Sequence, residues 1–317
     1  MRLRLVCLVV YLLSGLGGCM SFKVGQALPP TVWILAHAQP SLQQESDYEL
    51  ASRALPGALK TIEGFYVVDK DATHDLEPIL AEGYCQYATA FVEDEWEIAQ
   101  FAKKLDDVAY HNERASKMFV RCMNYALLQL GFERWQKELF GTPEQSAKLI
   151  ASAGPDQRTA LMFAALGLGG SINHNLSSPE MLSYLTTVKL MLAKVVELDA
   201  KYPPKSCDAT CLVHLALPHV ALGMVNSAAS EQFGGNAKVA SDEFAKALQI
   251  TGDRLMLARV LWAYRVGKMT NDRKLFHTQL VKVLDTDPAI WPEQRLANEV
   301  AHRRARRYLS HEKELFQ

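Results

Sequence analysis

Residues 237–252 read AKVASDEFAKALQITG, and this stretch decides the fold class. Ala240, Phe244 and Ala247 stand three or four positions apart, and Gly252 ends the run. This spacing puts their side chains on one face of an α-helix. The same offsets recur on both sides, at Val188, Leu192, Val195 and Ala200 and at Phe276, Leu280, Val283 and Pro288. The recurrence predicts an all-α chain built from repeated helical units.

Signals for the start of a helix recur along the chain on both sides of this stretch. Each combines a capping side chain or a first-turn proline with apolar residues every three or four positions. Ser46 followed by Glu49, for example, forms a capping-box pattern. The sequence therefore predicts about eleven helices in antiparallel pairs. They are expected to start near Ser46, Asp75, His111, Thr142, Asp156, Ser178, Asp208, Asn236, Asp253, Asn271 and Pro292.

The offsets at residues 240–252 resemble those of the second helix of the tetratricopeptide repeat. The first helices of the units match that repeat poorly, so we expect a degenerate, irregular array. In such an array each helix pair covers the apolar face of its neighbour, and the inner concave surface is available for binding.

Composition narrows the class of partner. The chain has 317 residues, of which 49% are hydrophobic, and carries 34 basic against 35 acidic side chains. A disordered chain would be poorer in apolar residues, and a nucleic-acid binder would carry excess positive charge. We therefore expect a globular protein with no nucleic-acid partner.

The N-terminus has the layout of an export signal. Arg2 and Arg4 precede the apolar run 5–13, which is shorter than the roughly 20 residues needed to cross a bilayer. LGGC at 16–19 resembles the bacterial lipobox, in which the cysteine is lipidated. The sequence predicts removal of residues 1–18 and lipidation of Cys19. The alternative is an ordinary cleaved signal with an incidental cysteine.

Met20, in place of the aspartate that retains many lipoproteins at the inner membrane, favours the periplasmic face of the outer membrane. Three prolines and several glutamines between residues 21 and 44 indicate a tether, with a short helical turn around Trp33. The expected domains are residues 1–18 as signal peptide, 19–44 as lipidated cysteine and tether, and 45–317 as the helical body.

Four cysteines remain after the anchor. Cys85 and Cys122 lie in apolar helical patterns, where a free cysteine behaves as a small hydrophobe. Cys207 and Cys211 lack the second ligand pair of a structural zinc site, so we expect no metal there. Inert helical residues are the favoured interpretation of this pair, and a local disulfide between them is the alternative.

No motif for catalysis is found. GLGG at 167–170 follows no strand and precedes no Gly-Lys-Ser/Thr, so close helix packing or space for a ligand explains it better than a phosphate loop. The histidines form no metal motif, and the serines lack a nucleophile elbow. We expect no catalytic residue, metal or cofactor, and therefore no enzyme.

Two charged runs have alternative interpretations. Glu93, Asp94, Glu95 and Glu97 surround Trp96 and form either a binding surface for a basic partner or a solvated helix face, and the second is favoured. The basic run comprises Arg303, Arg304, Arg306 and Arg307. For it we favour surface ion pairing over contact with anionic lipid or a partner.

Aromatic residues recur at helical spacing at Tyr84, Tyr87, Phe91 and Trp96 and again at Tyr125 and Phe132. We expect most of them in the core and a minority on the wall of an apolar channel.

Several motifs, taken in order, resemble the TRAP transporter T-component family of exported lipoproteins. They are DYELASRALPGALKTIEG at 47–64, LAEGYC at 80–85, FVEDE at 91–95, ALGLGGSI at 165–172, RLAN at 295–298 and AHRRA at 301–305. The resemblance spans about residues 45–316. It implies an all-helical fold with a groove or pore, association with a TRAP-type periplasmic solute-binding protein, and a small apolar organic ligand. No catalytic residues come with it.

The combined expectation is a membrane-tethered subunit that docks a solute-binding protein and handles a ligand. The alternative is a scaffold lipoprotein that holds peptides or subunits during envelope assembly. Association of copies of the chain is left open. The candidate ligand or partner surface comprises Tyr84, Tyr87, Phe91, Glu93, Asp94, Glu95, Trp96, Tyr125, Gly169, Gly170 and Asn173.

The anchor can be tested by replacing Cys19 with alanine. Several acyl chains on one cysteine give stable membrane attachment, because each buried methylene contributes about 0.8 kcal/mol. We expect the Cys19→Ala protein to leave the membrane fraction in a high-salt wash while the unchanged protein stays. Immunoblotting of the fractions measures this, and retention of the variant in membranes would show that Cys19 is not the anchor.

Overall fold

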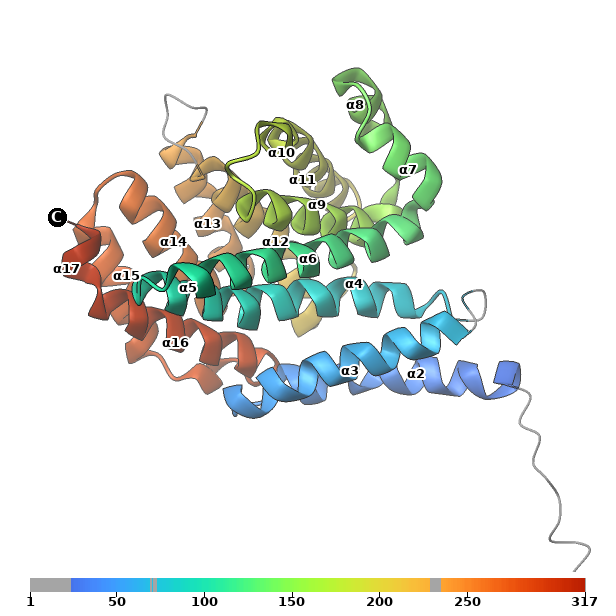
Figure 1. The fold of residues 1–317 in the computed structure, drawn as a ribbon, viewed down its shortest axis with the longest axis horizontal. Helices are drawn as coiled ribbons and strands as arrows, with labels where there is room; N and C mark the ends of the chain where they lie inside the picture. Colours follow the sequence, from blue (N-terminus) through green and yellow to red (C-terminus); the bar gives the residue numbers. More distant parts are fainter. Residues whose placement is uncertain (1–23, 69, 71–72, 229–234, 317) are drawn as a thin grey trace, which may run out of the picture.

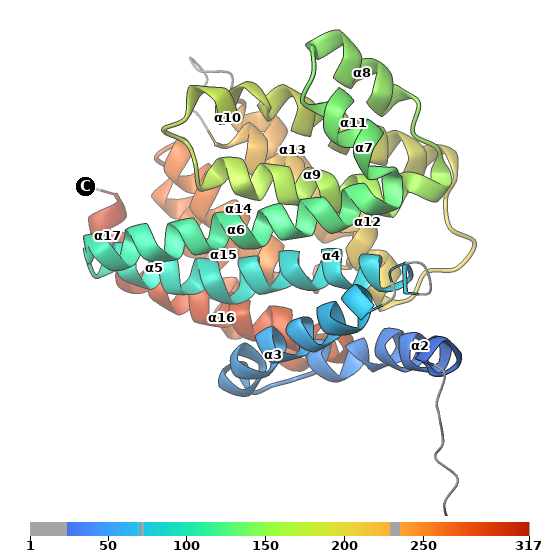
Figure 2. The same ribbon diagram turned by 45° about the vertical axis from the view of Figure 1, so that its right-hand side comes forward.

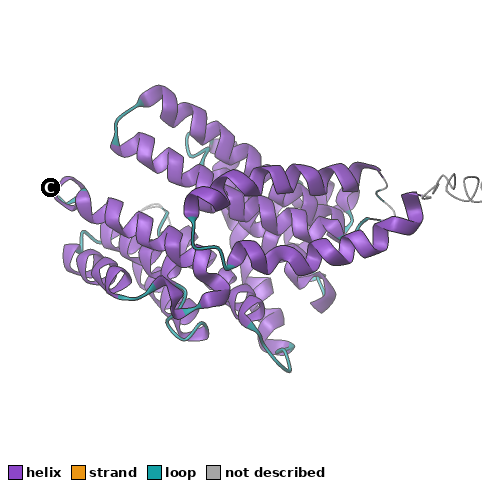
Figure 3. Ribbon diagram, turned by 90° about the horizontal axis from the view of Figure 1, so that it is seen from below, coloured by secondary structure: helices purple, strands orange, loops and turns teal. Residues whose placement is uncertain are grey.

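The computed structural model describes residues 24–68, 70, 73–228 and 235–316, so the predicted signal peptide and Cys19 lie outside it. Within these residues the chain forms helices and no strand, which confirms the all-α prediction (Figure 3). The first part of the chain forms α2 (Val24–Gln43), α3 (Tyr48–Val68), α4 (Leu76–Tyr87), the π-helical η1 (Ala88–Val92), α5 (Glu93–Phe101), α6 (Leu105–Leu130), α7 (Phe132–Leu139) and α8 (Pro143–Ala151).

The second part of the chain continues with a short 3-10 turn, η2 (Pro155–Gln157), and then with longer helices. These are α9 (Arg158–Asn173), α10 (Pro179–Ser183), α11 (Leu185–Lys201), α12 (Ala209–Asn226), α13 (Ala237–Ile250), α14 (Met256–Met269) and α15 (Arg273–Asp285). The turns η4 (Pro288–Ile290) and η5 (Pro292–Gln294) lead into α16 (Arg295–Ser310) and α17 (Glu312–Leu315).

Most helix starts follow the local capping chemistry. Side chains of the N-cap residues accept a hydrogen bond from a backbone N–H of the first turn at Thr142, Ser178, Asp208, Asn236 and Asp272. Each lies at, or one residue from, an expected start.

Two expected starts differ from the structure. Asp47, in place of Ser46, caps α3, because its Oδ1 accepts from the backbone N–H groups of Glu49 and Leu50. The start expected near His111 lies instead at Leu105, where the long helix α6 begins.

Helices that are near neighbours in the sequence pack against one another. α3 packs on α4, α6 on α4 and α9, α11 on α9 and α12, α12 on α13, and α14 on α15 (Figures 1 and 2). This arrangement is compatible with a tetratricopeptide-like array, in which each helix pair buries the apolar face of the next.

The last long helix closes the array. α16 packs on α14 and α15 as expected for the next unit, and it also contacts α2 and α3. In Figure 1 the start of α16 lies beside the left-hand ends of α2 and α3, while α17 lies at the far left. α16 thereby joins the last helices of the array to the first two helices that the structure describes.

A tether with a short helical turn around Trp33 is expected over residues 21–44, but residues 24–43 form the long helix α2. Val32 is buried, and Leu35 and Leu42 pack against the main hydrophobic core. Prolines disfavour an isolated helix, but packing of an apolar face supplies most of the stability of helices in proteins. Contact with the body therefore outweighs the local preference.

The prediction of free cysteines is also wrong. Cys85 of α4 and Cys122 of α6 form a disulfide with a Cα–Cα distance of 5.3 Å. The favoured interpretation of Cys207 and Cys211 as inert residues is overturned by a second disulfide, with a Cα–Cα distance of 5.1 Å. Spacing did not reveal the first bridge, because α4 and α6 become neighbours only after the chain passes through η1 and α5.

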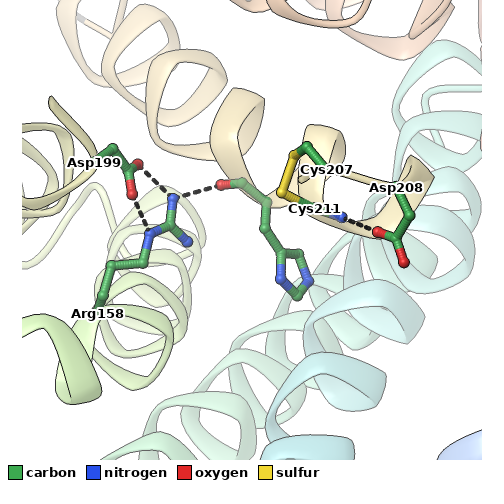
Figure 4. The surroundings of a disulfide bond; sticks show 6 residues. Arg158, Asp199, Cys207, Asp208 and Cys211 are labelled. Atoms are coloured by element: carbon green, nitrogen blue, oxygen red, sulfur yellow. Dashed lines mark hydrogen bonds and ion pairs between the residues drawn. A yellow bond between two sulfur atoms is a disulfide. The ribbon is translucent and has the colours of Figure 1, made fainter. Parts of the chain in front are cut away.

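The second disulfide lies at the start of α12 (Figure 4). Asp208 accepts a hydrogen bond from the backbone N–H of Cys211, so bridge and cap act on the same turn. Nearby, Arg158 of α9 donates to Asp199 of α11 at 2.6 and 2.7 Å and to the His214 carbonyl at 2.7 Å. Through this ion pair and the hydrogen bond to the carbonyl, Arg158 links α9, α11 and α12.

The two disulfides should differ in their contributions to stability. Loop-closure entropy grows with the number of residues enclosed, so the bridge spanning 37 residues should contribute about 3–4 kcal/mol and the bridge spanning 4 residues less. We expect Cys85→Ala/Cys122→Ala to lower the free energy of unfolding in urea by more than Cys207→Ala/Cys211→Ala does. Equal losses, or free thiols at these positions in alkylation and mass spectrometry, would contradict the assignment.

Candidate functional site

A cavity of about 290 Å³ lies inside the helical array. This volume is near the lower end of the range for small-molecule sites, about 300–1,000 Å³. Its walls come from both halves of the chain, including α4, α9, α12, α14 and α16, and are mainly apolar. Representative lining residues are Phe91, Phe163, Leu217, Met224, Leu261 and Val300.

α12 forms a large part of the apolar wall. In the described part of the chain it is the one helix whose length and composition would allow it to cross a membrane, and 28% of it is buried. Val213, Leu217 and Val220 line the cavity, and Gly223 lies against the ring of Phe244 on α13. α12 lines the cavity on one side and packs on α13 on the other, which explains why it is apolar on all sides.

The glycine-rich segment of α9 packs closely on α6 and also borders the cavity. A Cβ at Gly167 would come within 2.6 Å of the backbone nitrogen of Met123, and one at Gly170 within 2.4 Å of the Phe119 ring. These glycines let α9 approach α6 closely. Gly169 and Gly170 also line the cavity, and a Cβ at Gly169 would meet only Val188, at an ordinary 3.4 Å.

Among the residues that the structure describes, three charged side chains line the cavity: Glu82, Glu93 and Arg265. Glu82 accepts a hydrogen bond from Gln86, and its Oε2 lies 3.5 Å from Nε2 of His214. Arg265 of α14 donates from Nη2 to Oδ1 of Asn173 at 3.2 Å.

The acidic run on α5 is paired with the basic run on α16, so the expectation of a solvated face is wrong. The Asp94 side chain is fully buried, with its oxygens 2.7 Å from Nε of Arg303 and 2.7 Å from Nη1 of Arg307. Burial opposes ionisation of Asp94, but the neighbouring arginines, Arg307 first, hold its pKa below the ordinary value. Tyr48 also donates to Asp94 at 2.9 Å.

Arg304 lies at the centre of this cluster. Only 1% of its side chain is exposed, which overturns the favoured interpretation of the basic run as a surface feature. It donates to the Thr89 carbonyl at 2.6 Å and lies 3.6 Å from Glu93 and 3.7 Å from Glu97. Arg306 is exposed, as expected for the run. Charged groups of opposite sign are thus buried together, which is the condition under which burial of charge is tolerated.

His174 connects this cluster to α9 and α6. Its side chain is fully buried, with Nε2 3.0 Å from Oε1 of Glu93 and Nδ1 2.9 Å from Oδ1 of Asn112. The ring of Trp96 packs edge-on against it at 4.8 Å. Burial opposes ionisation of Glu93, but His174 and then Arg304 hold its pKa below the ordinary value. His174 therefore serves packing and charge pairing.

The structure separates the sequence-predicted site residues into two groups. Phe91, Glu93, Gly169, Gly170 and Asn173 line the cavity. The remainder do not line it: Tyr84, Tyr87, Asp94, Glu95, Trp96 and Tyr125.

Most of this second group has structural partners. Tyr84 and Tyr125 stack at 5.9 Å, and Tyr125 donates to Glu63 at 2.8 Å. Asp94 and Trp96 belong to the charge cluster and its surroundings, whereas Glu95 is exposed.

Sequence reasoning missed the walls from α12, α14 and α16. The apolar composition of α12 on all sides was a detectable signal for an unusual environment. Arg265 and Val300 gave no such signal, because their positions depend on how the array closes. Within the described chain, no three His, Cys, Asp or Glu residues are grouped as metal ligands.

Removal of the central arginine should destabilise the fold. Arg304→Met would remove the cation that lies 3.6 Å from Glu93 and 3.7 Å from Glu97, and breaking a buried pair in this way costs about 3–5 kcal/mol. Arg306→Met removes the same charge from an exposed position of the same helix and should change stability by less than about 0.5 kcal/mol. Urea denaturation measures both, and similar small losses for the two variants would show that the cluster does not hold the fold together.

Comparison with known proteins agrees with this architecture. The family model described as TRAP transporter T-component matches residues 44–316. No match was found among curated proteins. The matched segment covers both charged runs and every helix that lines the cavity except α2, which contributes Leu42 and Gln43. The chain therefore belongs to the TRAP transporter T-component family and is a component of a TRAP-type transport system.

Proposed function

We propose that this protein is a lipid-anchored envelope subunit that docks a TRAP-type periplasmic solute-binding protein and holds a small organic ligand in its central cavity. Membership of the family supports the transport role. The observation that carries the ligand-binding part is the apolar cavity of about 290 Å³ enclosed by both halves of the chain.

The chemistry of the cavity wall favours binding over catalysis. Apolar surface removed from water contributes about 25 cal/mol per Å², so a largely aliphatic wall favours a ligand with substantial apolar surface. The two acidic residues of the wall, Glu82 and Glu93, each lie within 3.5 Å of a histidine. Their carboxylates therefore already have partners within the fold. The protein would act by binding the ligand and presenting it to its partner.

The anchor gives the body a defined position. Five residue steps separate Cys19 from the start of α2 at Val24, and a chain of that length reaches at most about 17 Å. A lipid on Cys19 would therefore keep the α2 end of the body close to the membrane. The periplasmic face of the outer membrane is the location that we propose.

Ligand binding can be tested by filling the cavity. Gly169→Leu should project a side chain into the cavity, because only Val188 lies within 4 Å of a Cβ there. Gly57→Leu is the matched control, because Gly57 is exposed on α3 and a Cβ would meet nothing within 4 Å. Native mass spectrometry of the full chain carrying Cys19→Ala should show a co-purified small molecule with Gly57→Leu and about tenfold less with Gly169→Leu.

Several outcomes would contradict the proposal. An empty cavity in all proteins, or equal occupancy in both glycine variants, would remove the ligand-binding role. Bound peptides in place of a small molecule would favour a scaffold. For the docking role, sedimentation with a TRAP-type periplasmic solute-binding protein from the same organism should show a complex, and two separate species would contradict it.

A further inference from the structure

Arg265 differs from the other charged residues around the cavity. It projects from α14, lines the cavity and is partly buried. Its one hydrogen bond among the described residues is the 3.2 Å contact from Nη2 to the neutral amide oxygen of Asn173. A guanidinium carries five N–H donors, so most of its donor capacity is not used by the described residues.

The acidic groups on the same wall already have closer partners. Oε1 of Glu93 lies 3.0 Å from His174, and its Oε2 lies 3.6 Å from Arg304. Glu82 lies 3.5 Å from His214. Arg265 is close enough to lower the pKa of Glu93, yet it forms no ion pair within 4.0 Å among the described residues. It is the one basic residue that lines the cavity within the described chain.

The hydrogen-bond partner of Arg265 is close in sequence to a solvent-exposed residue of the cavity wall. Leu176 lines the cavity and is 50% exposed, so this part of the wall reaches solvent. Asn173, the partner of Arg265, lies three residues before Leu176, at the end of α9. On the other side of Arg265, Leu261 lies one turn earlier on α14 and begins the apolar wall. A polar end and an apolar interior are thus adjacent in one cavity.

We propose that the ligand is an amphipathic anion, with a carboxylate bound by Arg265 and Asn173 and an aliphatic tail along α12. Arginine binds carboxylates through two parallel hydrogen bonds, and a charged group with unused donors in an apolar wall is stabilised by such a partner. This proposal rests on the proposed function, since it names the chemistry of the molecule held in the same cavity.

The test compares three probes of equal chain length: octanoate, octanol and octylamine. Isothermal titration calorimetry of the full chain carrying Cys19→Ala should give octanoate an affinity about tenfold higher than octanol, with octylamine weakest. Arg265→Gln should weaken octanoate about tenfold and leave octanol unchanged. Arg265→Lys keeps the charge but not the planar fork and should restore part of the preference.

Lys268→Gln is the matched control, because it removes one positive charge from an exposed position three residues further on α14. It should leave all three affinities unchanged, and thermal unfolding should confirm that every variant is folded. An equal loss of octanoate affinity in Lys268→Gln would overturn the specific role of Arg265.

The remaining outcomes separate this inference from the proposed function. Equal binding of the three probes, with no effect of Arg265→Gln, would overturn the anion site and leave an apolar ligand cavity. Failure of all three probes while a neutral small molecule co-purifies would do the same. Failure of all three with nothing co-purified would overturn both proposals.

Discussion

The structure depends on the buried contact between the arginines of α16 and the carboxylates of α5. Arg303 and Asp94 are separated by 209 residues in the sequence and lie 2.7 Å apart in the fold. Buried charges are costly unless each has a close partner with good geometry. An apolar seam tolerates sliding, but these ion pairs form only when α16 returns to one position against α5. Closure of the array is therefore specified by charge as well as by apolar burial.

The cavity follows from that closure. The buried apolar residues form three clusters instead of one continuous core, and the lining residues come from the clusters of the first half and of α12–α14. α16 completes the enclosure with Leu296 and Val300. Close approach of α9 to α6 at Gly167 sets the inner surface of the first half. The cavity is thus the space that remains between helices of the first half and helices of the second half.

Local physics explains which features the sequence predicts. Capping side chains act within one turn, so the starts at Thr142, Ser178 and Asn236 are readable from the chain alone. Some residues of the candidate ligand or partner surface, including Gly169 and Asn173, line the cavity. The family is confirmed, whereas the lipid on Cys19 stays a prediction.

Long-range pairing explains what the sequence did not reveal. The disulfide between Cys85 and Cys122 depends on the position of α6 against α4. The burial of Asp94 depends on residues of the last helix. A run of charges on a helix is usually solvated, and only the tertiary fold shows that two such runs, acidic and basic, face each other.

The near neutrality of the chain has a structural basis that composition alone does not show. Asp94, Arg304 and Arg307 are all largely buried, and each lies within 4 Å of a charge of opposite sign. These charges are used within the fold and are not available to a partner. Arg265 lines the same interior without an ion pair. Charges with close partners determine how the helices are arranged. Arg265 has no such partner among the described residues, so its charge is the basis for the proposed chemistry of the ligand.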